Sequence, residues 1–164
     1  MTIDLKKLAK FLVKAKTGTY ASMDKKKIVP ERTLHNELDF SEGDFYYRDS
    51  YVGFFQAPGM EEVRLSSKYG RTIWTMAYSG GMNKKFHGDI GFAKETFSFL
   101  KNALGKVNEN APFRGPAKLK EGNWEYINTF KGDIENFVGH EKILFKGKEV
   151  FSQDYMGGLV VEKE

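Results

Sequence analysis

Hydrophobic residues recur at helical spacing in two segments of the chain. Apolar side chains fall on one helical face in the first segment, at Leu5, Leu8, Phe11, Leu12 and Ala15. The second segment shows the same spacing at Phe92, Ala93, Phe97, Leu100 and Leu104. An aspartate precedes each segment and can cap its first turn, and a glycine follows each, as is common at helix ends. The pattern therefore predicts helices over 4–16 and 89–104.

Between and after these helices, aromatic or β-branched residues alternate with polar ones, and glycines separate the runs. Because successive strand residues point to opposite sides of a sheet, each run divides into two faces. One face of the run at 45–52 is aromatic apart from one carboxylate, with Phe45, Tyr47, Asp49 and Tyr51. The opposite face is more polar, with Tyr46, Arg48, Ser50 and Val52. We expect the aromatic face to point into the protein and the polar face to meet solvent.

The chain also contains an internal repeat. Residues 42–53 align with 121–132, residues 59–63 with 139–143, and residues 70–81 with 147–158, in the same order and at a nearly constant offset. Such self-similarity indicates duplication. We therefore predict a single domain over 1–164 whose halves, approximately 1–86 and 87–164, are diverged copies of one α-βββ unit. The connections at 19–39 and 106–120 are long enough for each to hold an extra short strand.

These elements predict an α+β fold. Antiparallel strands would form one sheet or two, with both helices packed on it and a pseudo-twofold axis relating the halves. Such an arrangement leaves a concave surface or pocket where the halves meet, and pockets at such junctions commonly bind ligands.

Composition narrows the functional classes. The 164 residues include no cysteine, which excludes disulfides, thiolate zinc sites and a cysteine nucleophile. The three histidines are scattered, and phosphate-loop and dinucleotide motifs are absent from the sequence, so we expect neither a metal nor a cofactor. The net charge of +4 is mild, with lysines concentrated between Lys6 and Lys27, so nucleic acid is not an expected partner. No apolar run is long enough for a membrane span, and we expect a cytoplasmic protein.

The repeat pairs the candidate polar residues. The aromatic face of the second copy carries Trp124, Tyr126, Asn128 and Phe130, so Asn128 matches Asp49. Glu61 likewise matches Glu141 on the next predicted strand of each half. A polar group on an aromatic face either forms a structural hydrogen bond or lines a pocket, and both interpretations remain open. The two glutamates could act as acid–base groups, bind an arginine or anchor a loop.

A proline-rich segment, Ala111-Pro112-Phe113-Arg114-Gly115-Pro116, stands outside the repeat. Two prolines and a glycine restrict the backbone around Arg114 and give its guanidinium a defined direction. This group could hold the carboxylate or phosphate of a ligand, or it could pin the segment to Glu61 or Glu141.

Residues 45–53, 112–116 and 132–141 resemble an uncharacterised prokaryotic domain family, and the resemblance extends from Leu5 to Gly158. In that family the domain occurs alone or fused behind a helix-turn-helix in proteins regarded as transcriptional regulators. The resemblance implies a sensing role, and it carries over no catalytic or binding residue.

We therefore predict a non-catalytic domain that binds or senses a small molecule. The predicted pocket residues are Tyr47, Asp49, Tyr51, Arg114, Tyr126, Asn128 and Phe130. One alternative is an acid–base enzyme that uses Asp49, Glu61 or Glu141. Another is a protein-interaction module, and a homodimer is compatible with all three functions.

Overall fold

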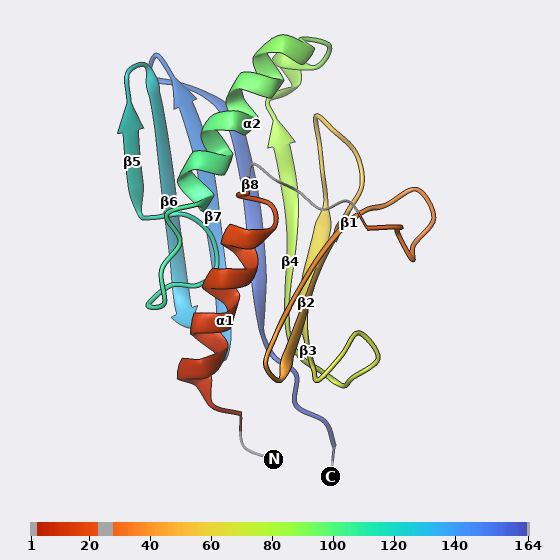
Figure 1. Ribbon diagram of the computed structural model, residues 1–164. Coiled ribbons are helices and arrows are strands. Elements are labelled where there is room, and N and C mark those ends of the chain that lie inside the picture. Colours follow the sequence, from red (N-terminus) through yellow and green to blue (C-terminus); the bar gives the residue numbers. More distant parts are fainter. Residues whose placement is uncertain (1–2, 23–27, 164) are drawn as a thin grey trace.

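A computed structural model describes residues 3–22 and 28–163; three of the lysines noted above, Lys25, Lys26 and Lys27, lie outside these ranges. Within these ranges the chain forms two α-helices, each followed by four strands (Figure 1). The first half comprises α1 (Leu5–Gly18), β1 (Asn36–Glu42), β2 (Phe45–Tyr51), β3 (Gly59–Leu65) and β4 (Thr72–Met82). The first half ends with the 3-10 helix η1 (Lys84–Phe86). The second half comprises α2 (Ile90–Leu104), β5 (Lys118–Glu121), β6 (Trp124–Asp133), β7 (Asn136–Phe145) and β8 (Lys148–Leu159).

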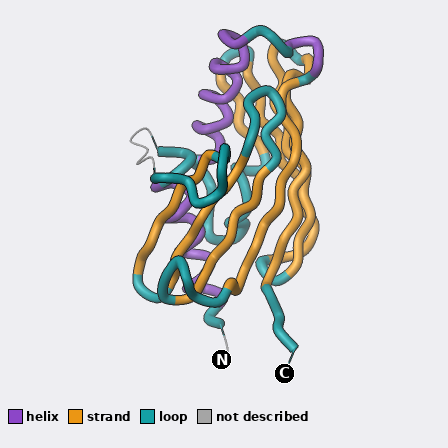
Figure 2. Tube along the Cα trace, turned by 90° about the vertical axis from the view of Figure 1, so that its right-hand side faces the viewer, coloured by secondary structure: helices purple, strands orange, loops and turns teal. Residues whose placement is uncertain are grey.

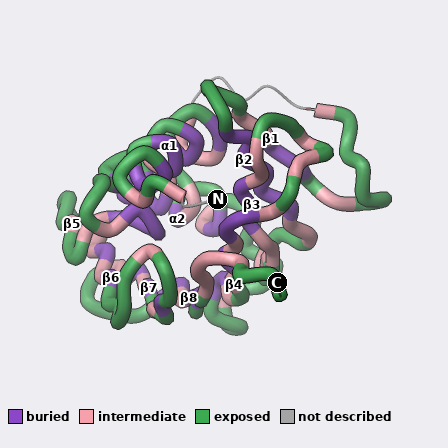
Figure 3. The backbone as a smooth tube through the Cα atoms, turned by 90° about the horizontal axis from the view of Figure 1, so that it is seen from below, coloured by how far each residue is buried: buried purple, intermediate pink, exposed green. Residues whose placement is uncertain are grey.

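All eight strands form one antiparallel sheet in the order β1-β2-β3-β4-β8-β7-β6-β5. The strands β4 and β8 meet at the centre, where Tyr78 pairs with Tyr155. Both helices pack on the same face of the sheet (Figure 2). Seen from below, the sheet bends into an arc with the helices on its inner side (Figure 3). The structure is therefore a helix-on-sheet protein of the α+β class, as predicted.

Each half has one strand more than the three predicted. The additional strands, β1 and β5, lie in the two long connections and form the edges of the sheet. Their sequences, NELDFSE and KLKE, are dominated by polar and charged residues. Edge strands often carry charged side chains that discourage pairing with other chains. A strand of this composition has too few apolar residues for a clear alternating pattern.

The helices begin where the sequence predicts. The carboxylate of Asp4 accepts hydrogen bonds from the backbone amides of Lys6 and Lys7, and that of Asp89 accepts one from Phe92. Helix α1 continues to Gly18, one half-turn beyond the predicted end. Each helix packs its apolar stripe on a separate core. The first core includes Leu8, Leu12, Val63 and Trp74, and the second includes Leu100, Ala103, Ile143 and Phe151.

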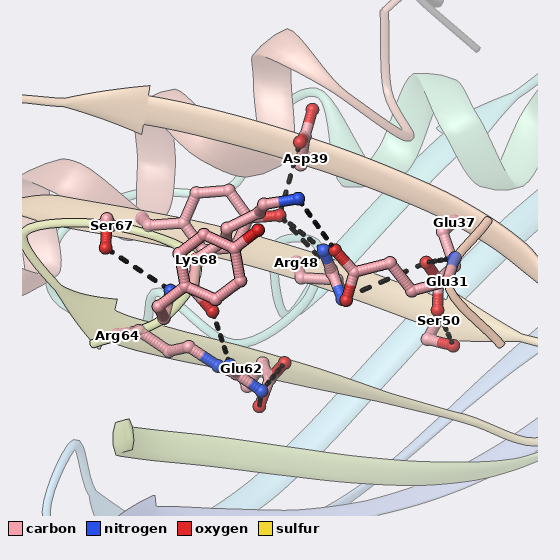
Figure 4. A network of polar contacts seen from close by, with 11 residues as sticks. Glu31, Glu37, Asp39, Arg48, Ser50, Glu62, Arg64, Ser67 and Lys68 are labelled. Atoms are coloured by element: carbon pink, nitrogen blue, oxygen red, sulfur yellow. Dashed lines mark hydrogen bonds and ion pairs between the residues drawn. The ribbon is translucent and has the colours of Figure 1, made fainter. Parts of the chain in front are cut away.

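The outer face of β2 is buried, and the expectation that it meets solvent was wrong. Tyr46, Arg48 and Ser50 are exposed by only 5%, 7% and 5%. Charged residues of β1, β3 and the segment before β1 cover them (Figure 4). Arg48 donates from Nη1 to Glu31 Oε2 at 2.8 Å, and Ser50 donates to Glu37 at 3.1 Å. These polar residues can be buried because they form hydrogen bonds and ion pairs with one another.

Helices that are long and apolar enough to cross a membrane are absent from the described part of the chain.

Candidate binding cavity

A cavity of about 720 Å³ lies between the C-terminal end of α1, helix α2 and the concave face of the sheet. Ligand sites are typically clefts of roughly 300–1,000 Å³ with apolar walls and a few polar groups. Aromatic side chains contribute much of the apolar wall of this cavity, namely Tyr20, Tyr47, Tyr51, Phe54, Tyr78, Phe97, Phe113 and Phe151. One group of polar side chains also lines it, comprising Lys16, Asp49, Glu61, Arg114 and Gln153.

Strand alternation brings part of this lining together. Tyr47, Asp49 and Tyr51 share the helix-facing side of β2, and Glu61 is the cross-strand neighbour of Asp49 on β3. A bridge between Gln56 and Gly81 holds the β2–β3 loop against β4. A Cβ atom at Gly81 would lie 2.0 Å from the carbonyl oxygen of Phe55, so this close approach requires glycine. The loop thereby forms one wall of the cavity.

Two buried cations neutralise two buried glutamates at the polar end. Arg114 donates from Nε and Nη2 to Glu141 Oε1 at 3.0 and 2.6 Å. Its Nη1 atom lies 3.7 Å from Glu61 Oε1, and Lys16 Nζ forms an ion pair with the other oxygen of Glu61. All four side chains are at most 9% exposed. Glu61 therefore joins helix α1, strand β3 and the loop that carries Arg114.

The pKa values of these cations follow from burial and their partners. Burial lowers the pKa of Lys16, and the negative charge of Glu61 opposes this only in part. Burial also acts to lower the pKa of Arg114, but Glu141 outweighs it, and the pKa of Arg114 is raised. Arg114 therefore remains charged at any physiological pH.

Glu141 is fully occupied by partners from its own half. In addition to Arg114, it accepts a hydrogen bond from the Tyr126 hydroxyl at 2.6 Å and from Gln153 Nε2 at 3.1 Å. Glu141 has an exposed fraction of 0%. Its role is to anchor the proline-rich loop through Arg114, which is one of the roles predicted for it.

Asn128 is also held by this loop. Its Nδ2 donates to the carbonyl of Gly115 at 3.0 Å, and its Oδ1 accepts from the Tyr155 hydroxyl at 2.8 Å. The amide of Gly115 donates to the Tyr126 oxygen at 3.0 Å. A Cβ atom at position 115 would lie 2.8 Å from the Tyr126 ring, so glycine permits this packing. The loop thus fills the space in front of Tyr126 and Asn128.

Asp49 has a different environment from Asn128. The Tyr78 hydroxyl donates to its Oδ1 at 2.6 Å, as Tyr155 does to Asn128. Asp49 is 3% exposed, and it forms no ion pair with any residue in the described ranges. Burial, reinforced by the nearby Glu61 carboxylate, raises the pKa of Asp49 to about 7. Burial and Asp49 together raise the pKa of Tyr78 well above its ordinary value.

The structure thus separates the residues that the sequence grouped in one pocket. Tyr47, Asp49, Tyr51 and Arg114 line the cavity, together with Glu61. Tyr126 and Asn128 are buried behind the proline-rich loop and lie outside the lining. Phe130 is 41% exposed and packs edge-to-face on Phe113 at 5.2 Å between ring centroids. The path of the loop explains why Tyr126 and Asn128 lie apart from the others, because the loop packs over these two side chains and leaves Tyr47 and Asp49 facing the cavity.

Two important lining residues were absent from the predicted site. Tyr78 aligns with Tyr155 in the sequence, as Asp49 aligns with Asn128, so the alignment could have added Tyr78 to the candidate residues. Lys16 lies in the last turn of α1, where a lysine usually interacts with the helix dipole in solvent. The helical pattern did contain a signal, because Lys16 follows Leu8 and Leu12 at four-residue spacing on the buried stripe of α1. A lysine on such a stripe is easily overlooked, since lysine is rarely buried.

A second polar cluster lies on the opposite face of the sheet (Figure 4). Its centre is Glu31, which pairs with Arg48 at 2.8 Å and with Lys68 at 3.1 Å. Hydrogen bonds from these two cations lower the pKa of Glu31 to about 2. Arg64 also donates from Nη2 to both carboxylate oxygens of Glu62, at 2.9 and 3.1 Å. This cluster fastens the segment before β1 to the sheet.

Groups of three or more potential metal ligands are absent from residues 3–22 and 28–163.

Comparisons with curated proteins and with solved structures produced no match to the chain. A family model described as a domain of unknown function, DUF5680, matches residues 49–160. The matched range runs from Asp49 to beyond the end of β8 and includes Glu61, Arg114 and Glu141. Because the match covers more than half of the sequence, the chain belongs to the DUF5680 family of domains of unknown function.

Proposed function

We propose that the protein binds a small organic molecule in the cavity between its helices and its sheet. The observation that carries the proposal is the combination of aromatic walls and a buried, charged end in a cavity of about 720 Å³. A stable core alone would favour apolar side chains at this position, because burying charges is costly even when they are paired. A ligand that contacts these groups would explain why charged side chains are buried at this end of the cavity.

We further propose that the two halves are diverged copies related by an approximate twofold axis near β4 and β8. The hydroxyl pairs Tyr78–Asp49 and Tyr155–Asn128 support this relation. Each tyrosine also covers a glycine on the neighbouring strand, Gly59 in the first half and Gly139 in the second. The ligand site would then be a feature of one copy only.

The family resemblance suggests a regulatory setting for this binding, in the cytoplasm. We propose that the ligand acts as a signal, because Glu61 connects α1, the sheet and the proline-rich loop around the cavity. A ligand at this junction would change the free-energy difference between arrangements of these three elements.

Thermal-shift screening against a metabolite library tests the proposal. A ligand at about 100 times its Kd stabilises the folded state by about 2.7 kcal/mol. Ser98 lines the cavity from α2, so Ser98→Trp should fill part of it and abolish the shift. Glu95→Trp is the matched control, because Glu95 is exposed on the same helix and lies outside the lining. Hits that persist in the Ser98 variant would place the ligand elsewhere and refute the proposal.

A second candidate function is acid–base catalysis by Asp49. It is favoured by one observation, the pKa of Asp49 near 7, which suits a general base at neutral pH. Glu61 and Glu141 are held in ion pairs, which leaves Asp49 as the candidate among the three carboxylates. Mass spectrometry of each library hit after incubation distinguishes the two functions. Conversion by the wild type and none by Asp49→Asn would favour an enzyme, and an unchanged ligand favours binding.

A further inference from the structure

We propose that the cavity selects molecules with an organic ammonium or amidinium group, which pairs with the carboxylate of Asp49. The inference rests on the proposed binding function and specifies the chemical class of the ligand.

The balance of charges at the polar end supports this assignment. Lys16 and Arg114 provide two positive charges, and both are engaged by Glu61 and Glu141. The third carboxyl group, Asp49, receives a hydrogen bond from a neutral tyrosine. When Asp49 is ionised, the negative charges of this cluster exceed the positive ones by one. A cation beside Asp49 would restore the balance, and buried charges are stable mainly when they are paired.

In the second half, the proline-rich loop fills the position that matches the space beside Asp49. There the loop presents the carbonyl of Gly115 to Asn128 Nδ2 and the amide of Gly115 to the Tyr126 oxygen. The matching residues of the first half, Asp49 and Tyr47, face the cavity. A carboxylate accepts hydrogen bonds and cannot donate them. The group that completes the first half must therefore be a donor, and an ammonium group supplies several.

The walls around Asp49 also suit a cation. Tyr47 and Tyr51 line the cavity from the same strand as Asp49, two residues before and after it. Tyr78 lines it from β4, where its ring already lies 5.5 Å from the guanidinium of Arg114. The face of an aromatic ring attracts an organic cation by about 0.5–2 kcal/mol, and more when water is excluded. The same ring face repels an anion, so the aromatic lining adds to the preference that Asp49 creates.

An anionic ligand fits the cavity less well, although four cations line it. Lys16 and Arg114 are engaged with glutamates, and an anion would have to displace one of them beside Asp49. Lys94 is exposed and Lys101 is partly buried on α2, so water screens their charge. The ammonium of Lys101 is also engaged in a cation–π contact, since it lies 5.8 Å from the centre of the Tyr20 ring.

Isothermal titration calorimetry with three indole compounds of matched shape tests the inference. The probes are tryptamine, tryptophol and indole-3-propionate, which carry a cationic, a neutral and an anionic group. At pH 8 we expect tryptamine to bind at least about tenfold more tightly than tryptophol, which corresponds to 1.4 kcal/mol. Indole-3-propionate should bind most weakly. Three phenyl compounds, phenethylamine, phenethyl alcohol and 3-phenylpropionate, repeat the comparison on a smaller ring.

The Asp49→Asn variant should remove the preference for the amine and bind tryptamine and tryptophol equally. This variant should fold, because Asn128 occupies the matching position with the same tyrosine partner. Circular dichroism and a thermal melt check this. Asp154→Asn is the matched control, since it removes the same charge from an exposed carboxylate on β8. It should leave the preference unchanged.

The outcomes separate the two proposals. An amine preference that persists in Asp49→Asn, or tighter binding of the alcohol or the acid, overturns the inference and leaves cavity binding intact. Failure of all six probes at millimolar concentration also overturns it. The proposed function itself fails only if the library screen yields no ligand whose binding the Ser98→Trp variant abolishes.

Discussion

Asp49 on β2 and Asn128 on β6 occupy matching places in the two halves, and each accepts a hydrogen bond from a tyrosine of a central strand. In the second half the proline-rich loop packs against Asn128 and supplies a complementary backbone group. In the first half the same side of the sheet faces a cavity. Similar side chains therefore serve as packed structure in one half and as the lining of a cavity in the other.

The comparison shows that the role of a polar side chain on this face of the sheet depends on what packs against it. An amide suits the packed half, because it can donate to the loop carbonyl and accept from the tyrosine at once. A carboxyl group suits a place that a cation can enter. The exchange between acid and amide follows this difference, and the predictions below test it from the largest expected effect to the smallest.

The largest effect is expected from Arg114→Met. The substitution leaves Glu141 buried without its cation, and breaking a buried pair in this way costs about 3–5 kcal/mol. Urea denaturation followed by fluorescence measures the loss in free energy of unfolding. Arg71→Met is the control, because Arg71 is exposed and its replacement should change the free energy by less than about 0.5 kcal/mol. Equal stability of the two variants would mean that the ion pair contributes nothing to the loop.

The Asn128→Asp substitution introduces, in the second half, the acid that stands at the matching position of the first half. The new carboxylate would face the carbonyl of Gly115, where the amide now donates. An unsatisfied buried group costs about 1–3 kcal/mol, and more when it is charged, so we expect a loss of about 3 kcal/mol at pH 8. The loss should shrink at pH 5, because a protonated carboxyl group can again donate. A variant as stable as the wild type at pH 8 would contradict the packed role of this site.

Asp49→Asn makes the opposite exchange beside the cavity. The folded-state pKa of Asp49 is about 7, above its ordinary value, so the folded protein binds the proton more tightly than the unfolded chain does. This contribution to stability is complete below pH 4 and is lost as the pH rises towards 7. The asparagine variant should therefore gain roughly 2 kcal/mol relative to the wild type between pH 5 and pH 8.

Denaturation curves of both proteins at pH 5, 6, 7 and 8 measure this change. Asp154→Asn is a suitable reference, because the Asp154 carboxylate is exposed. A constant stability difference between Asp49→Asn and the wild type across this range would show that Asp49 titrates normally.

The smallest effect concerns the affinity for an amine. Pairing requires ionised Asp49. The titratable groups around it are Glu61, Tyr78, Lys16, Arg114, Tyr47, Tyr51 and Tyr20. Since the alkyl ammonium of tryptamine, like that of a lysine side chain, stays charged below about pH 9, the pKa of Asp49 controls the change. Tryptamine affinity should fall about tenfold from pH 8 to pH 6 in the wild type and stay constant in Asp49→Asn. A flat profile in the wild type would show that Asp49 does not pair with the amine.

The helices and three strands of each half, β2, β3 and β4 and then β6, β7 and β8, could be predicted from the sequence because their signals are local. The apolar stripes of α1 and α2 and the aromatic alternation of β2 follow directly from helix and strand geometry. The edge strands β1 and β5 were only suspected, since their charged residues give no alternation. The burial of Arg48 was missed because its partner Glu31 lies in a separate segment whose position no local pattern indicates.

By itself, the sequence determined the two helices and the aromatic faces, and it aligned Asp49 with Asn128 and Glu61 with Glu141, because each of these depends on periodicity or on alignment. Only the tertiary structure decided which member of each pair meets a cavity. That outcome depends on where the proline-rich loop packs and on Lys16 reaching Glu61 from another element. Contacts between distant segments leave no repeating signal in either one, so the difference between a filled half and an open half exists only in the folded protein.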